Sequence, residues 1–206
     1  MQASGRSAAH GFTLVELMVT LAVAAILLSV ATPNFRAAVE HAQQESSVYR
    51  LAGMLTLARS EAIKQSTRVA VCARANDTSC GKDWNQGWLV FTDDGDNTGV
   101  IDAGETILAT APPLPGTVRL ASYARVAAGS TATAQNAIRF GPRGTSSWKN
   151  GGTFRFCTPS GDASARALNI SLVGDVRHAA KNGSTGRLVD TYGKDVRCPR
   201  EEGGSQ

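Results

Sequence analysis

The sequence has 206 residues, of which 42% are hydrophobic and 18% are charged, and its net charge at pH 7 is +4. This composition is that of a folded protein and excludes a largely disordered chain, while so small a positive excess is not by itself evidence for nucleic-acid binding. The length allows one membrane helix and one modest domain.

The chain opens with a short polar segment followed by a long apolar run. Residues 1–11 contain basic side chains but no acid, and within residues 12–31 the one ionisable side chain is Glu16. Twenty mostly apolar residues are enough to cross a bilayer as a helix, and the basic flank favours a cytoplasmic position for the residues before it. A carboxylate inside such a run is costly, so the pattern indicates a function for Glu16.

The Gly11-Phe12 junction lies in front of the apolar run, and Glu16 follows it. This arrangement resembles the class III signal of type IV pilins and type II secretion pseudopilins. The resemblance implies that a prepilin peptidase cuts after Gly11 and methylates the new N-terminus at Phe12. It also implies that Glu16 acts in filament assembly, and that Pro33 is the helix-kinking proline that many of these proteins have.

Apolar residues continue at steps of three and four after Pro33, which predicts one helix from residue 12 to about residue 67, with a transmembrane half at 12–33. We expect Pro33 to kink this helix rather than end it. The predicted apolar face consists of Val39, Ala42, Val48, Leu51, Leu55, Ala58 and Ala62. The predicted solvated side contains Glu40, Gln43, Gln44, Glu45 and Arg50.

After residue 67 the chain has short segments rich in β-branched and aromatic residues, separated by Gly, Pro, Asn and Asp. The expected strands are Arg68–Ala73, Trp88–Thr92, Glu105–Ala109, Val118–Ser122, Ala137–Phe140, Thr153–Cys157 and Leu168–Leu172. Residues 127–135 are expected to form a loop, and residues 178–206 to be irregular. Such strands suit antiparallel sheets with one face packed on the helix.

The predicted fold class is therefore α+β, with a long N-terminal helix packed against an antiparallel β-sheet head, as in type IV pilins. The predicted parts are a leader peptide (1–11), the helix (12–67), a β-rich globular head (68–200) and a disordered tail (201–206).

Further residues resemble the subfamily that contains pseudopilin H of type II secretion (GspH) and the fimbrial proteins FimT and FimU. The matching segments are Ala58–Lys64, Val69–Cys72, Asp83-Trp84, Gly87-Trp88, Phe91, Asp102–Glu105, Ile107-Leu108, Ile138–Phe140, Phe154–Cys157 and Ile170–Gly174. They extend over most of the chain, and they select this subfamily among the pilin-like proteins.

The four cysteines are Cys72, Cys80, Cys157 and Cys198. No two of them form a Cys-x-x-Cys pair and the chain has 3 histidines, so a zinc site is poorly supported. An even number of cysteines beyond a membrane anchor suggests disulfides in an oxidising compartment. Three pairings are open, and proximity favours Cys72–Cys80 with Cys157–Cys198.

An acidic loop has the spacing of oxygen ligands in a calcium-binding loop. Its candidate ligands are Asp94, Asp96, Thr98, Asp102 and Glu105, with a glycine at the sixth position. Strand-like rather than helical segments flank it, and the other reading is an Asp/Gly-rich hairpin connection in which these residues serve turn geometry. No other cofactor is predicted.

The C-terminal region is rich in basic residues, namely Arg177, Lys181, Arg187, Lys194, Arg197 and Arg200. Clustered cations on a loop can bind DNA phosphates independently of sequence. Some FimT-like proteins bind DNA through a C-terminal Gly-Arg-x-Arg motif, and Gly174-Asp175-Val176-Arg177 stands at the matching place with an acid in the second position. The alternative is a solvated tail.

The sequence contains no motif of a hydrolase, metalloprotease or phosphate-binding enzyme, so we predict a protein without catalytic activity. The predicted function is that of a minor pilin or pseudopilin, made as a single-pass inner-membrane prepilin with its head in the periplasm. It would be assembled into a type IV pilus or a type II secretion pseudopilus, at fibre initiation or at the tip. The implied partners are other pilins or pseudopilins, the prepilin peptidase and the inner-membrane assembly platform. The alternative function is DNA binding for natural transformation.

Overall fold

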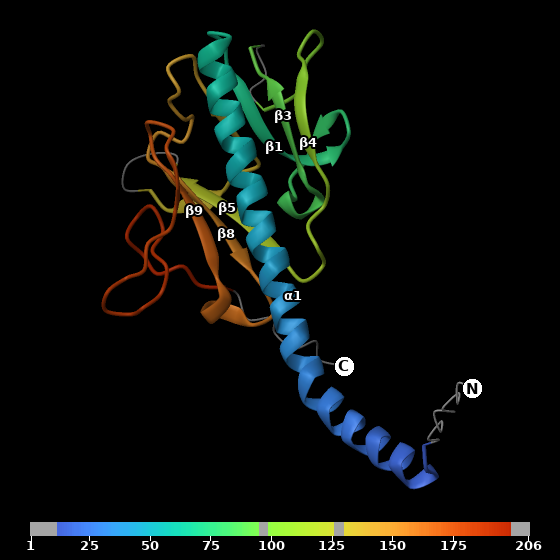
Figure 1. The fold of residues 1–206 in the computed structure, drawn as a ribbon. Coiled ribbons are helices and arrows are strands. Elements are labelled where there is room, and N and C mark those ends of the chain that lie inside the picture. Colours follow the sequence, from blue (N-terminus) through green and yellow to red (C-terminus); the bar gives the residue numbers. More distant parts are fainter. Residues whose placement is uncertain (1–11, 95–98, 126–129, 199–206) are drawn as a thin grey trace, which may run out of the picture. The chain divides into compact units, whose positions relative to one another are not determined.

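The computed structural model describes residues 12–94, 99–125 and 130–198, without the side chains of residues 30–34 and 163. The chain forms two compact units, residues 1–39 and residues 40–206, and each is considered by itself. The second unit is the head. Figure 1 shows its two sheets and the part of the helix that packs on them.

Helix α1 (Leu14–Lys64) is capped by hydrogen bonds at both ends. The hydroxyl of Thr13 accepts the backbone N–H of Glu16 at 3.2 Å, which caps the first turn. At the other end Ser66 adopts a left-handed conformation with φ 52°. The N–H of Thr67 reaches the carbonyl of Ala62, and the N–H of Ser66 reaches that of Ile63, which together form a Schellman C-cap. The helix therefore ends before the first strand, which begins at Val69.

The first sheet contains β1 (Val69–Asn76), β2 (Ser79–Cys80), β3 (Trp88–Thr92), β4 (Ile107–Ala111) and β7 (Ala137–Phe140). Its order is β2-β1-β3-β4, with β7 also paired to β1, and every pairing is antiparallel. A short 3-10 helix, η1 (Trp84–Gln86), leads into β3.

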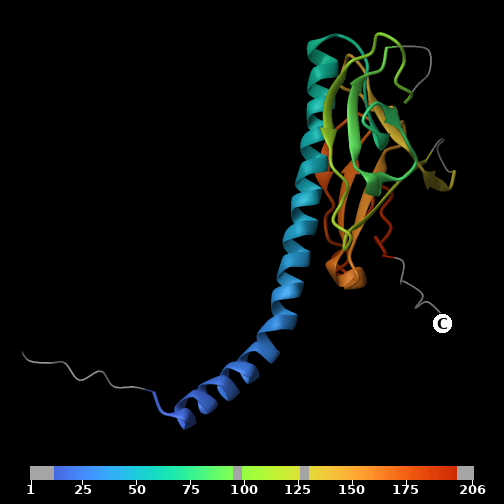
Figure 2. The same ribbon diagram turned by 90° about the vertical axis from the view of Figure 1, so that its right-hand side faces the viewer.

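The second sheet has the antiparallel order β10-β9-β8-β5-β6. Its strands are β5 (Arg119–Arg125), β6 (Ala132–Ala134), β8 (Gly152–Cys157), β9 (Arg166–Ile170) and β10 (Val176–His178), with η2 (Gly161–Ser164) between β8 and β9. Figure 2 shows the head part of α1 lying along both sheets.

The core of the head lies between this part of α1 and the two sheets. The helix contributes Val48, Leu51, Met54, Leu55, Ala58 and Ala62, and the sheets contribute large side chains such as Trp88, Phe140, Phe154 and Phe156. Trp84, Trp88 and Phe91 are all buried, so these aromatic residues belong to the core.

The buried face of the helix differs from the prediction at its start. Ala42 is exposed and Val39 is 37% exposed, whereas Gln44 is completely buried and donates its side-chain N–H to the carbonyl of Phe156 at 3.2 Å. The reason is that α1 meets the second sheet near Gln44, so the apolar spacing before that point has no sheet to face.

Three strands were not expected from the sequence. β2 is a two-residue strand that pairs with β1, and β6 lies inside residues 127–135, for which a loop was predicted. β10 ends at His178, the first residue of the region expected to be irregular. The strand expected at residues 168–172 is Arg166–Ile170, because the chain turns at Ser171. Beyond β10, residues 179–198 form no further strand, only two isolated bridges, Lys181 with Leu188 and Val189 with Asp195.

Candidate functional site

The N-terminal part of α1 exposes an unusual number of large apolar side chains. They include Phe12, Leu14, Val15, Leu17, Met18, Val19, Leu21, Val23, Ile26, Leu27, Leu28 and Phe35, each at least half exposed. An apolar surface this continuous is typical of a segment that another molecule or a lipid phase covers. In the part of the chain that the structure describes, no helix meets the combined length and hydropathy required of a membrane span.

Glu16 is exposed in the first turn of this segment. Its backbone N–H is bound by Thr13, and among the described residues its carboxylate has no hydrogen-bond or ion-pair partner. Gly11 lies outside the described residues, as do the other residues of the predicted leader, and the side chain of Pro33 is not described. α1 itself continues through position 33.

Two disulfides are present in the head. Cys72 pairs with Cys80 and Cys157 pairs with Cys198, which is the arrangement that proximity in the sequence favours. The first joins β1 to β2. The second joins β8 to the end of the C-terminal segment, 41 positions later.

Side chains also attach the C-terminal segment to the second sheet. The Tyr123 hydroxyl donates to Asp190 at 3.3 Å, and burial, helped by the negative Asp190, raises the pKa of Tyr123 to about 12. The backbone N–H of Arg125 donates to the Tyr192 hydroxyl, and the Arg125 guanidinium lies 4.1 Å from the centre of that ring. Asn169 donates to the carbonyl of Val189. The C-terminal residues that were expected to be irregular are therefore held against the second sheet by specific hydrogen bonds.

The acidic loop is described only in part, because Asp96 and Thr98 lie outside the described residues. The carboxylate of Glu105 accepts the backbone N–H of Asp102 at 2.8 Å, as in a turn. In the described ranges no three Asp, Glu, His or Cys side chains come together as a metal site requires. Calcium binding by Asp94, Asp102 and Glu105 with the two undescribed residues stays a prediction.

Asp93, which the sequence reasoning did not select, is buried beside this loop. Its carboxylate accepts the backbone N–H of Gly99 at 3.1 Å and lies 3.7 Å from the guanidinium of Arg139. Burial raises the pKa of the Asp93 carboxyl. Asp93 therefore fixes the connection between β3 and β4 to the neighbouring β7.

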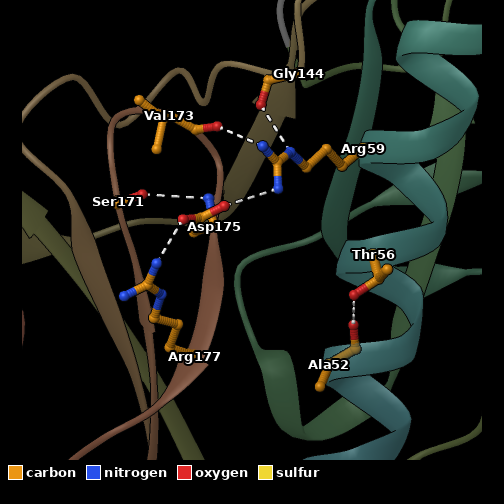
Figure 3. Close-up of polar contacts among 8 residues, drawn as sticks. All are labelled: Ala52, Thr56, Arg59, Gly144, Ser171, Val173, Asp175 and Arg177. Carbon is orange, nitrogen blue, oxygen red and sulfur yellow. Dashed lines mark hydrogen bonds and ion pairs between the residues drawn. The ribbon is translucent and has the colours of Figure 1, made fainter.

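Arg59 of α1 is the centre of a polar cluster at the turn between β9 and β10, shown in Figure 3. Its guanidinium donates to the Gly144 carbonyl at 3.2 Å, the Val173 carbonyl at 2.9 Å and the Asp175 carboxylate at 3.0 Å. The second carboxylate oxygen of Asp175 accepts from Arg177 at 2.9 Å. Asp175 therefore lies between two cations, and one arginine of the helix fixes the end of the second sheet.

Gly174 makes this close approach geometrically feasible. Its φ is +80°, and a Cβ at this position would collide with the carbonyl oxygen of Gly144. Glycine adopts such a conformation without the steric cost that a side chain brings. A side chain at position 174 would therefore displace the turn that carries Asp175.

A polar cavity of about 310 Å³ lies beside the cluster. Its lining residues are Thr56 and Arg59 from α1 and Gly174, Asp175, Val176 and Arg177 from the β9–β10 hairpin. The Thr56 hydroxyl donates to the carbonyl of Ala52 within the helix, as Figure 3 shows.

The ion pairs with Asp175 give a prediction about pH. Hydrogen bonds from Arg59 and then Arg177 lower the pKa of the Asp175 carboxyl below its ordinary 3.8. Because the pKa of Asp175 is lower in the folded than in the unfolded chain, its ionised carboxylate stabilises the fold at any pH above the unfolded-state pKa. This stabilisation is lost as the pH falls through the folded-state pKa. We expect the melting temperature of Asp175→Asn to be lower than that of the wild type at pH 5–7. The difference between the two melting temperatures should disappear as the pH falls below about 3.8. Asp77→Asn, at an acid that is 88% exposed, is the control and should show almost no difference.

The basic residues predicted to bind DNA do not share one environment. Five of them are described, and Arg200 is not. Arg177 is paired with Asp175, and Arg187 lies 3.5 Å from Asp162. For these two positions the nearest partner is therefore an acid of the same chain.

The sequence comparisons give two family matches. The model described as type II transport protein GspH matches residues 47–174, and the model of the prokaryotic N-terminal methylation motif matches residues 6–32. A comparison with curated protein sequences gives no significant match.

Two solved structures illustrate the structural similarity. The type IV minor pilin FimU of Pseudomonas aeruginosa (strain PAO1) has a TM-score of 0.51 and 22% sequence identity, over 68% of this chain and 91% of that one. The minor pseudopilin EpsH from the type 2 secretion system of Vibrio cholerae has a TM-score of 0.44 and 14% sequence identity, over 67% of this chain and 97% of that one. The FimU comparison supports a pilin-like fold.

Proposed function

The chain belongs to the GspH family of type IV pilin-like proteins, the subfamily that also contains FimT and FimU, and from this premise we propose that it is a minor structural subunit of a filament. In this proposal it enters the inner membrane as a prepilin with its head in the periplasm. It is cleaved after Gly11, methylated at Phe12, and assembled into a type IV pilus or a type II secretion pseudopilus, at fibre initiation or at the tip. Its role is structural and involves no catalysis.

The exposed apolar surface of residues 12–29, together with Phe35, is the observation that supports this proposal most strongly. Such a surface needs cover, first from lipid and then from neighbouring subunits. The methylation-motif match over residues 6–32 includes both the expected cleavage point and most of this surface. A lipid-anchoring function alone would not require Glu16 within it.

Glu16 supplies a physical reason for ordered assembly. Cleavage at Gly11 creates a cationic amine at Phe12, but within one helix this amine and Glu16 are about 6 Å apart along the axis. The amine of a neighbouring subunit is the better partner, because pairing the two charges offsets a desolvation cost of several kcal/mol per ion. A neighbour in the wrong axial register would leave both charges unpaired, so the pair selects one register.

Processing at Gly11 can be tested by a pair of leader variants. We expect Gly11→Val to abolish cleavage, so that the chain keeps residues 1–11, whereas Gly5→Val in the same leader should be cleaved at the wild-type level. Mass spectrometry of the N-terminal peptide from membranes is the measurement, and a methylated Phe12 is expected in the wild type and in Gly5→Val. Normal cleavage of Gly11→Val would contradict the assignment.

DNA binding for natural transformation stays an untested alternative. The acid at Asp175 pairs with Arg177, the arginine that the FimT-like motif would supply to a phosphate. No described contact favours this function, so we do not propose it.

A further inference from the structure

β10 is the edge strand of the second sheet, and among the described residues no strand pairs with its other side. The N–H of Ser171 bonds to the carbonyl of Asp175, and the N–H of Ala179 bonds to that of Ala167. Hydrogen-bonded pairs alternate along an antiparallel ladder, so Arg177 directs its backbone groups toward β9. The N–H and C=O groups of Val176 and His178 consequently point away from the sheet, and no described residue bonds to them.

The head part of α1 runs beside this free edge. Tyr49 packs against His178 with 5.4 Å between ring centres, and Thr56 and Arg59 line the cavity whose other wall is Val176 and Arg177. Between Tyr49 and Thr56, on the same side of the helix, is Gly53, where a Cβ would meet nothing within 4 Å. β10 thus borders an open groove, and Thr56 and Arg59 of α1 line the opposite side of it.

We propose that this groove binds an extended segment of a neighbouring subunit, which adds a strand beside β10. Exposed edge groups are a template for such strand addition, in which backbone hydrogen bonds supply affinity and side-chain pockets supply specificity. An added strand lies about 4.8 Å from its neighbour, whereas a helix is about 10–12 Å across, so a strand needs less room beside β10 than a helix does.

The charges along the edge indicate the chemistry of the segment. The Arg177 side chain is 77% exposed, and of its three nitrogens only Nη2 has a partner among the described residues. The groove therefore carries two cations, Arg59 and Arg177, and one acid, Asp175. An extended segment with an acidic side chain opposite Arg177 therefore fits better than a basic one.

The inference rests on the proposed filament function, so the experiment must separate the two. Full-length chains carrying photoreactive benzoylphenylalanine at Gly53 are incorporated into fibres and irradiated, and a second set carries it at Phe35 in the apolar segment. We expect both positions to crosslink to another pilin-like subunit, and the Gly53 adduct to map to an extended segment containing Asp or Glu. If Phe35 crosslinks and Gly53 does not, the groove proposal falls while the filament function stands; if neither does, both fall.

A proline at His178 tests the hydrogen bonding itself. His178→Pro removes an N–H that points outward, so the β9–β10 pairing should survive, and the extended conformation of Arg177 tolerates a following proline. The Gly53 crosslink should fall at least about fivefold, the factor corresponding to one lost hydrogen bond, while the Phe35 crosslink stays unchanged. His178→Ala, which loses the same ring contact but keeps the N–H, is the matched control and should crosslink within about twofold of the wild type.

Hydrogen exchange of the wild-type chain gives a readout that does not depend on how a variant folds. The amides of Val176 and His178 should exchange at least about tenfold more slowly in fibres than in the free chain. Equal exchange in the two states, an unchanged Gly53 crosslink in His178→Pro, or a Gly53 adduct with nucleic acid would each overturn the proposal.

Discussion

Replacing both Cys157 and Cys198 by serine is expected to lower the free energy of unfolding of the head by about 4 kcal/mol. The reason is that the bond closes a loop of 41 positions, and loop closure removes more entropy from the unfolded chain as the loop grows. Both cysteines are buried, together with Val196 and Ala167, so the variant also loses packing around the bond. Urea unfolding of residues 40–206 measures this loss.

The second disulfide provides the matched control. Cys72 and Cys80 are 8 positions apart, and the same loop-closure entropy gives their bond a stabilisation of roughly 2.5 kcal/mol. We therefore expect the double serine variant at Cys72 and Cys80 to lose less stability than the variant at Cys157 and Cys198. An equal or opposite order would show that loop closure is not the dominant contribution.

Glu16→Ala is expected to remove most of the chain from the filament while leaving the head folded. The substitution deletes one partner of the proposed pair and leaves the amine of Phe12 uncompensated in an apolar site, which costs about 3–5 kcal/mol. Such a cost corresponds to at least a hundredfold lower incorporation. Insertion in the membrane should not fall, because the apolar run becomes more hydrophobic.

Thr20→Ala is the control for this experiment. Thr20 is another exposed polar residue of the same helix, and within the described part of the chain its hydroxyl bonds only to the carbonyl of Leu17. We expect it to enter fibres at the wild-type level. The quantity to measure is the ratio of chain in sheared fibres to chain in membranes, and a wild-type ratio for Glu16→Ala would refute the register mechanism.

Local patterns in the sequence predicted the elements whose spacing is regular. The helix, β3 and β7 follow from periodic apolar or β-branched runs, and β3 and β7 have the bounds that the sequence indicates. β6 was missed because Ala132–Ala134 is bland, and it is a strand only because β5 pairs with it. Gln44 was placed in solvent by its polarity, whereas the position of the second sheet buries it.

The polar cluster at the β9–β10 turn could not be predicted, because its partners are far apart in the chain. Arg59 and Asp175 are 116 positions apart, and no local pattern joins them. Gly174 was the available signal, since a glycine between strand-like segments marks a turn. Its need for a left-handed conformation against Gly144 becomes visible only when the two loops are placed together.

Membership in a filament is the central claim, and mass spectrometry of fibres sheared from cells that produce the full-length chain tests it most directly. We predict peptides of the head together with an N-terminal peptide that begins at methylated Phe12, in smaller amounts than those of the main fibre subunit. Recovery of the chain solely in the membrane fraction, with residues 1–11 still attached, would contradict the proposed function.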